Sequence, residues 1–314
     1  MIDVTLDKRL HQADYTLIRY QLRFEEDFSM PAYALLRLRR ELSRVLKAGG
    51  TESLNHTDLL RPSLPTDPAL LRQVQQPAPG FVLQVDSVRP HKFIGGDQLS
   101  LVVCFFAQGM LLIEPFSRLL DALGSVGLCR NVGRFHLESI EDVSGLSGNE
   151  QLWKGGPIQV TPTILDLTRK FEGLSPSSVT FEFQTPARLL KNSRPLFRPQ
   201  FVEIFPFILR RVTGMLAVWA NLEDIFDVGY LLECATRVDE FDRRFGWQDW
   251  RPLHRNEEAG GLSGSVTLGG KDLVHVWPVL KVGELFGIGK GAAFGAGRYH
   301  LIDSDMLSAE KLQV

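Results

Sequence analysis

One motif occurs twice in this chain, starting at residues 127 and 291, which are 164 positions apart. Both copies, 127–137 and 291–301, read Gly, five residues, Gly, Arg, an aromatic residue, His and Leu. The same shift, applied without gaps, lays residues 15–20 over 179–184, 31–48 over 195–212 and 113–123 over 277–287. Because these segments agree in one register, we interpret the chain as two tandem copies of one fold.

The first copy contains segments in the order βαββαβ. Strands are predicted over 14–24 and near 81–88, 98–107 and 132–140 from their content of β-formers. A helix is predicted over 31–48, with Ser29 as N-cap and Gly49-Gly50 as its stop, and a second helix near 114–126. This order is that of the ferredoxin-like unit. We therefore expect an α+β protein with two ferredoxin-like, RRM-like domains over 1–145 and 179–314, joined by a linker over 146–178.

The second copy repeats the pattern with one addition. Val179, Phe181 and Phe183 alternate as in a half-buried strand, and the apolar residues between Phe201 and Trp219 recur at helical spacing. The acidic stretch 223–238 predicts an additional helix, for which a solvated face is the simplest interpretation.

Composition limits the class of protein. The 3 cysteines lie far apart without Cys-x-x-Cys spacing, which indicates neither a disulfide framework nor a zinc site. The longest apolar candidate, 101–113, is broken by Gln108 and Gly109, and no basic-then-apolar leader precedes it. We expect a soluble, cytoplasmic protein with no membrane segment, no metal and no cofactor.

Charge is unevenly distributed along the chain. The net charge is −2, yet basic residues gather in 37–47 and 186–211, while acidic residues gather in 223–242. The average charge therefore does not exclude a polyanionic partner.

Residues 287–297 contain five glycines, and this loop is the strongest functional signal in the chain. Glycine is favoured where the backbone needs a positive φ or must lie against a ligand, and an anion such as phosphate is the expected guest. A Walker loop is excluded because Glu284 stands where its first glycine is required and Gly291 replaces its hydroxyl residue. A dinucleotide fingerprint is excluded because the loop leads into a strand instead of opening a helix. The remaining interpretation is a phosphate-contacting loop that carries Lys290 and Arg298.

Three segments resemble a known family. The loop and strand 287–301, the strand and turn 179–191, and residues 250–255 followed by 260–264 resemble the CRISPR-associated endoribonucleases that process precursor guide RNA, members of the RAMP superfamily. The resemblance is specific at the glycine loop and diffuse in the first domain. It implies that repeat RNA is held across two ferredoxin-like domains and cleaved without metal. A 2′-hydroxyl would attack the adjacent phosphate and leave 2′,3′-cyclic phosphate and 5′-hydroxyl ends.

That chemistry requires a base for the 2′-hydroxyl, a donor for the charged phosphorane and an acid for the leaving oxygen. The resemblance implies a histidine on or just after the first helix of the first domain, and His56 is the only histidine so placed. Lys47 is the neighbouring candidate for charge stabilisation. His254, flanked by Arg251 and Arg255, is the reserve catalytic candidate, with phosphate contact as its other role.

The residues expected to bind RNA are basic side chains and glycines of the two copies. They are Arg37, Arg40, Arg44, Arg188, Lys191, Arg194, Arg251, Arg255, Gly287, Gly289, Lys290, Gly291 and Arg298. His136 and His300 occupy equivalent positions in the two copies, which favours a shared structural role. The expected partners are CRISPR repeat RNA, mature crRNA and subunits of an effector complex. A non-catalytic RAMP subunit that binds guide RNA as a scaffold is the alternative.

Overall fold

The computed structural model describes residues 7–48, 59–65, 76–86, 88–145, 150–171, 175–249 and 260–303. It divides into two units, each with its own core. Among the described residues, the N-terminal unit comprises 13–166 with 217–221, and the C-terminal unit comprises 7–12, 167–216 and 222–303. Both units combine helices with antiparallel sheet, so the α+β class expected from the sequence is confirmed.

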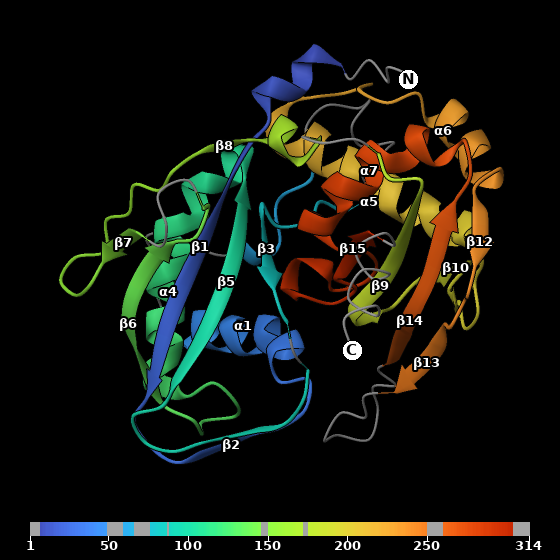
Figure 1. Cartoon of the computed structure of the whole chain (residues 1–314). Coiled ribbons are helices and arrows are strands. Elements are labelled where there is room, and N and C mark those ends of the chain that lie inside the picture. The colour runs from blue at the N-terminus through green and yellow to red at the C-terminus, as the bar shows by residue number, and fades with distance from the viewer. Residues whose placement is uncertain are drawn as a thin grey trace, which may run out of the picture. The chain divides into compact units, whose positions relative to one another are not determined.

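The N-terminal unit is built on a six-stranded sheet with the order β3-β5-β1-β6-β7, in which β8 also pairs with β1 (Figure 1). The first strand, β1, lies between the third and the fourth strands of the repeat, as in the ferredoxin-like unit. Its elements are β1 (Asp14–Phe24), α1 (Leu38–Ala48), β3 (Phe81–Gln84), β5 (Gln98–Phe106), α4 (Ile113–Val126), β6 (Phe135–Asp142), β7 (Glu150–Trp153) and β8 (Leu165–Asp166).

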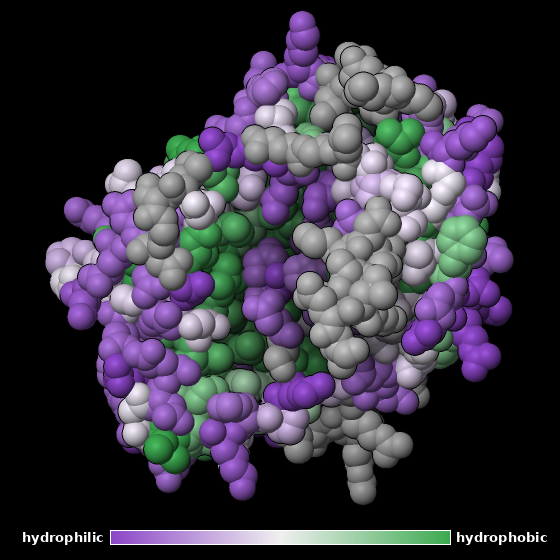
Figure 2. All heavy atoms as spheres, viewed as in Figure 1, coloured by the Kyte–Doolittle hydropathy of each residue, from purple (hydrophilic) through white to green (hydrophobic). Residues whose placement is uncertain are grey.

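The C-terminal unit repeats this topology with the strand order β12-β14-β9-β15, and β13 also pairs with β14 (Figure 1). Its first strand, β9, again lies between the third and the fourth. Hydrophilic residues (purple) surround β12 at the right edge of the view in Figure 2. The elements are β9 (Ser178–Ala187), α5 (Phe201–Ala220), α6 (Val228–Thr236), β12 (Asp239–Phe241), β13 (Gly246–Asp249), β14 (Gly260–Gly269), α7 (Leu273–Phe286) and β15 (Tyr299–Asp303).

The predicted register of the internal repeat is visible in the element boundaries. Strand β1 begins at Asp14 and β9 at Ser178, while β6 begins at Phe135 and β15 at Tyr299. Both pairs differ by the 164 positions found in the sequence. The two units therefore share their strand order, and their first and last strands keep the spacing of the repeat, which supports the duplication.

Aromatic residues fill the core of the C-terminal unit. The rings of Phe181 and Tyr299 stack with their centroids 4.3 Å apart, and the Tyr299 hydroxyl donates to the carbonyl oxygen of Leu280 at 2.7 Å. A Cβ atom at Gly283 would lie 2.1 Å from that hydroxyl, so only glycine admits the ring at this turn of α7. Burial raises the pKa of Tyr299 well above its ordinary value. This tyrosine thus fixes the closing strand against α7.

The first helix begins later than the sequence indicated. Residues 28–30 form β2 (Phe28–Met30), which pairs with β4 (His91–Phe93), so Ser29 lies in a strand and does not cap a helix. The physical reason is burial, since the Phe28 ring packs 5.3 Å from the Phe24 ring, and Phe93 packs 4.4 Å from Phe24. A short 3-10 turn over Leu35–Arg37 then leads into α1 at Leu38.

The acidic helix is also shorter than predicted. It begins at Val228, where the Asp227 side chain accepts a hydrogen bond from the N–H of Tyr230 at 2.9 Å, and it ends at Thr236. The backbone at Asn221 and Asp224 has φ of 55° and 52°, which interrupts the helix that composition alone indicated.

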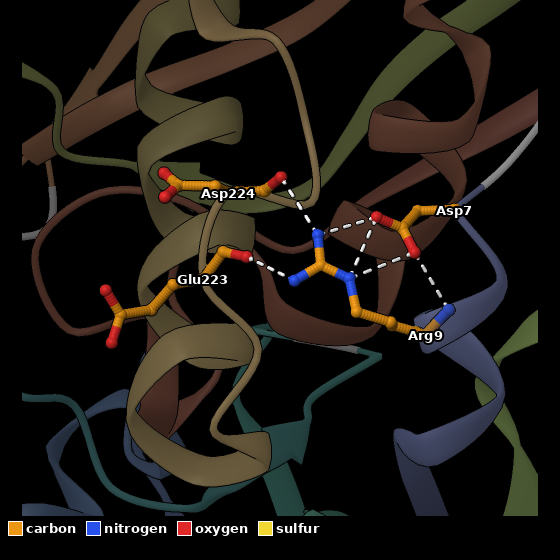
Figure 3. A network of polar contacts seen from close by, with 4 residues as sticks. All are labelled: Asp7, Arg9, Glu223 and Asp224. Atoms are coloured by element: carbon orange, nitrogen blue, oxygen red, sulfur yellow. Dashed lines mark hydrogen bonds and ion pairs between the residues drawn. The ribbon is translucent and has the colours of Figure 1, made fainter.

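The N-terminal segment 7–12 attaches to this interruption (Figure 3). Arg9 pairs with the Asp7 carboxylate at 2.7 Å, and its guanidinium also donates to the carbonyl oxygens of Glu223 at 3.2 Å and Asp224 at 3.3 Å. The hydrogen bond from Arg9 lowers the pKa of Asp7. Arg9 thereby satisfies two carbonyl groups left outside any helix after α5 ends.

Among the described residues, no helix combines the length and the apolar character needed to cross a bilayer. No disulfide joins the cysteines in the described part of the chain, and Cys104 and Cys234 are buried. Burial also raises the pKa of the Cys129 thiol to about 11. Among the described residues, no group of three His, Cys, Asp or Glu side chains is arranged so that it could hold a metal ion.

Candidate nucleic-acid interface

The glycine loop, defined as residues 287–297, connects α7 to β15. All five of its glycines have φ between 59° and 87°, as the sequence predicted. At two of them close contact also excludes a side chain. A Cβ at Gly297 would lie 2.0 Å from the carbonyl oxygen of Ile288, and one at Gly289 would lie 2.6 Å from that of Arg188. The loop is therefore folded tightly against the end of β9.

Hydrogen bonds within the protein use much of the loop backbone. The N–H of Gly287 donates to Gly283 at 2.9 Å, that of Ile288 to Gly297 at 2.9 Å, and that of Lys290 to Arg188 at 3.0 Å. Across the described ranges, the N–H groups of Gly289 and Gly291 donate to no protein acceptor. The Lys290 side chain between them is exposed. The part of the loop that can contact phosphate is thus its tip, Gly289-Lys290-Gly291.

Thr185 holds the other side of the loop, and sequence reasoning did not single it out. Its buried hydroxyl donates to the carbonyl oxygen of Gly295 at 2.6 Å and accepts the N–H of Arg298 at 2.9 Å. The carbonyl oxygen of Arg298 in turn accepts the N–H of Gln184 at 2.9 Å. Arg298 is half-buried at this junction. The available signal was a threonine directly before Pro186 at the end of a buried strand.

A second cationic element, the basic hairpin of residues 188–198, follows β9. Strands β10 (Leu190–Lys191) and β11 (Arg194–Pro195) are joined by Asn192 and Ser193, which have φ of 52° and 63°. Positive φ at both central residues is typical of a type I′ turn. Lys191 and Arg194 are exposed, and Lys191 lies 3.7 Å from the Glu203 carboxylate. The bond from Lys290 to Arg188 connects this hairpin to the loop tip.

The cations predicted in the N-terminal unit lie on and before α1. Arg40 and Lys47 are exposed on this helix, while Arg37 is half-buried just before it. Arg44 is held by an ion pair with Glu41 at 2.8 Å, and Glu41 also accepts the backbone N–H of Arg130 at 3.3 Å. Glu41 therefore ties α1 to the turn after α4 and holds Arg44, so that Arg40 and Lys47 are the more accessible of these cations.

Four predicted site residues lie outside the described residues. They are His56, Arg251, His254 and Arg255. Their roles stay predictions from the sequence. Lys47, the neighbouring candidate, is placed in the last turn of α1.

The two histidines at equivalent positions of the repeat each lie beside a glutamate. His136 is 3.7 Å from Glu25, and His300 is 3.6 Å from Glu284. Burial raises the pKa of Glu284, but bonds from His300, Lys281 and the backbone outweigh it, so the net pKa lies below its ordinary value. Glu284 also accepts the N–H of Leu301 at 2.8 Å. These contacts fit the structural role that the sequence indicated for both histidines.

Two family models match the chain. Residues 181–299 match the family described as CRISPR-associated endoribonuclease Cas6. Residues 13–164 match a model described as an N-terminal domain. The first match contains most of β9, the basic hairpin and the glycine loop. No curated protein matches the sequence.

Several solved structures share the fold. A partial Cas6-RT-Cas1–Cas2 complex superposes with a TM-score of 0.61 at 17% identity, covering 93% of this chain. This chain spans less than half of that one, 46%. A Cas6 of Thermus thermophilus superposes with a TM-score of 0.53 at 14% identity, with 92% and 99% of the two chains covered. A Cas6 product complex gives 0.52 at 16% identity with the same coverage. At these identities the likeness concerns the fold.

Proposed function

We propose that this chain, whose residues 181–299 match the family described as CRISPR-associated endoribonuclease Cas6, binds the repeat RNA of a precursor CRISPR transcript and cleaves it as a member of that family. The supporting observation is the hydrogen bond of 3.0 Å from Lys290 to Arg188. It joins the tip of the glycine loop to the basic hairpin inside the segment that matches the family.

The loop tip and the basic hairpin together offer the groups that bind a phosphate backbone. The N–H groups of Gly289 and Gly291, which have no acceptor in the described part of the chain, lie on either side of the exposed Lys290, and exposed Lys191 and Arg194 continue the positive charge along the hairpin. Backbone N–H groups and basic side chains are the donors that position nucleic-acid phosphates. We propose that successive phosphates of the repeat RNA contact the loop tip and the hairpin.

For the cleavage step we propose metal-independent chemistry. The 2′-oxygen before the cleaved bond attacks the phosphorus while its proton passes to His56. The bond from phosphorus to the 5′-oxygen breaks, and that oxygen takes a proton from a second group of the site. Lys47 is proposed to stabilise the charged phosphorane, and His254 is the reserve for proton transfer. The products carry 2′,3′-cyclic phosphate and 5′-hydroxyl ends.

The proposed partners are repeat RNA and its product, the mature crRNA. One solved relative is a Cas6 product complex and another is a Cas6-RT-Cas1–Cas2 complex. We propose that this chain likewise retains its cleaved RNA and passes it to other CRISPR subunits, acting without a bound cofactor and away from membranes, in the cytoplasm.

The test is cleavage of a repeat-containing RNA by the purified chain in EDTA, followed by analysis of both ends of the product. We expect cleavage at one site in the repeat, a terminus resistant to phosphatase until acid opens the cyclic phosphate, and a 5′ end that polynucleotide kinase labels directly. Tight binding of the repeat without cleavage would instead support the scaffold function. Loss of cleavage in EDTA that magnesium restores would overturn metal independence.

A further inference from the structure

An aromatic pair begins at the end of the basic hairpin, with Phe197. The rings of Phe197 and Trp247 have centroids 4.8 Å apart at an interplanar angle of 56°. Phe197 is 54% exposed, which is unusual for so large an apolar side chain. The two residues are 50 positions apart in the sequence (247 − 197) and both belong to the C-terminal unit.

The tryptophan is fixed in place by its strand. Its indole N–H donates to the Asp249 carboxylate at 2.7 Å. On the paired strand β14, Gly260 stands opposite Asp249, and a Cβ at this glycine would lie 2.6 Å from the indole nitrogen. A side chain at this position would therefore displace the ring. Trp247 thus supports Phe197 from one side, while the exposed part of the Phe197 ring remains open to a ligand.

Two arginines flank the exposed phenylalanine in the sequence. Arg194 precedes Phe197 by three residues and Arg198 follows it, and both side chains are exposed. Among the described residues, neither side chain makes an ion pair. Phe241 provides a contrast, since it is 53% exposed on β12 but has Asp239, Glu240 and Asp242 as neighbours. Figure 2 shows the hydrophilic residues that surround β12. Of these two exposed phenylalanines, Phe197 is the one that combines exposure, an aromatic support and arginines nearby in the sequence.

We propose that Phe197, supported by Trp247, is a stacking platform for an unpaired nucleobase of the bound RNA. This inference rests on the proposed function, because it assigns the base contact that accompanies the phosphate contacts of the hairpin. Aromatic side chains stack on bases of single-stranded RNA, and neighbouring arginines contact the adjoining phosphates. The platform gives the site a preference for RNA with at least one unstacked base beside the segment held by the hairpin.

The experiment measures binding of repeat RNA to wild type, Phe197→Ala, Phe197→Tyr and the control Phe241→Ala at one fixed salt concentration. Each is also measured with a repeat RNA series that carries one abasic nucleotide, scanned along the unpaired positions. Phe197→Ala should weaken binding of intact RNA about 5- to 150-fold, since stacking on one aromatic residue is worth roughly 1–3 kcal/mol. Phe197→Tyr should stay within about 3-fold of wild type, because a phenol ring still stacks, and Phe241→Ala should bind like wild type.

The abasic series identifies the ligand. At one position the abasic RNA should bind wild type as weakly as intact RNA binds Phe197→Ala, and the two changes together should cost no more than either alone. Unchanged affinity of Phe197→Ala, with wild type binding the repeat normally, would overturn this inference and leave the proposed function standing. Equal losses at every abasic position would also overturn it. A wild type that neither binds nor cleaves repeat RNA would overturn the proposed function, and the platform with it.

Discussion

The backbone N–H of Lys290 donates to the carbonyl oxygen of Arg188 at 3.0 Å, across 102 positions of sequence (290 − 188). This bond fixes the exposed tip of the glycine loop against the first residue of the basic hairpin. Because backbone atoms form it, side-chain substitutions at either residue leave it in place. Charge can therefore be removed from the interface without unfolding it.

Replacement of Lys191, Arg194 and Lys290 together by alanine should weaken RNA binding and flatten its salt dependence. Each lost phosphate contact should reduce the slope of log K against log salt by about 0.7 to 0.9. The melting temperature should hardly change, because exposed charges contribute little to stability. Filter binding over a salt series measures the slope. Lys92, Lys154 and Lys271, also exposed, replaced together form the control with the same change in charge. An equal loss in both triple variants would show that net charge alone drives binding.

Two glycines of the loop should respond differently to alanine. Gly297→Ala would place a Cβ 2.0 Å from the carbonyl oxygen of Ile288, so we expect a loss of stability well above that from backbone strain alone. Gly291→Ala meets only the Ala296 Cβ, at 3.5 Å, and should cost about 1–2 kcal/mol because its φ is 87°. Thermal unfolding of the two variants compares them directly. Equal melting temperatures would contradict the tight packing described for Gly297.

The charged form of Glu284 should stabilise the folded protein at neutral pH, and this contribution should be lost in acid. Its carboxylate accepts the N–H of Leu301 and lies 2.8 Å from Lys281, and its pKa is below the ordinary 4.5 in the folded state. A carboxyl with a lowered folded pKa contributes stability that is present above the unfolded pKa and is lost as pH falls through the folded pKa. Glu284→Gln should therefore cost about 1–3 kcal/mol at pH 7, with the difference shrinking below pH 4.5.

Chemical unfolding at pH 7 and at lower pH values measures this difference. Glu114→Gln serves as control, because the pair of Glu114 with Arg118 is exposed on α4 and should contribute less than about 1 kcal/mol at either pH. A constant deficit of Glu284→Gln across the pH range would contradict the role given to its charge.

The sequence predicted the parts of the fold that depend on local pattern. Strand β1 begins and ends at the predicted residues because its apolar side chains alternate, and the loop glycines have the positive φ that their number indicated. Ser29 misled the helix prediction, since it resembles an N-cap but lies between Phe28 and Met30, whose burial favours a strand. The outcome there depends on pairing with residues 91–93, far along the chain.

The candidate site, too, could be predicted from the sequence only in part. Residue types at 287–298 indicated a phosphate loop, but the acceptors that use its N–H groups, such as Arg188, are distant in sequence. Sequence alone therefore could not show that the N–H of Lys290 is used, whereas those of Gly289 and Gly291 on either side have no acceptor among the described residues. The pair of Phe197 and Trp247 depends on the pairing of β13 with β14 and carries no local signal.

His56→Ala should leave RNA binding nearly intact and slow cleavage by about 10²- to 10⁴-fold, the usual contribution of a positioned proton-transfer group. Single-turnover cleavage at saturating protein separates the two effects. Lys47→Ala and His254→Ala are measured in parallel. Full activity of His56→Ala with loss in His254→Ala would move the base to the C-terminal unit.

The most direct test of the account uses one substituted nucleotide. Wild-type protein is incubated in EDTA with repeat RNA that is all ribose, or that carries a single 2′-deoxy nucleotide immediately before the cleaved bond. We predict cleavage of the first RNA and none of the second at that bond, with equal affinity for both, because the substitution removes the nucleophile alone. Equal cleavage of the two RNAs would show that water or another group attacks the phosphate, and would contradict the account.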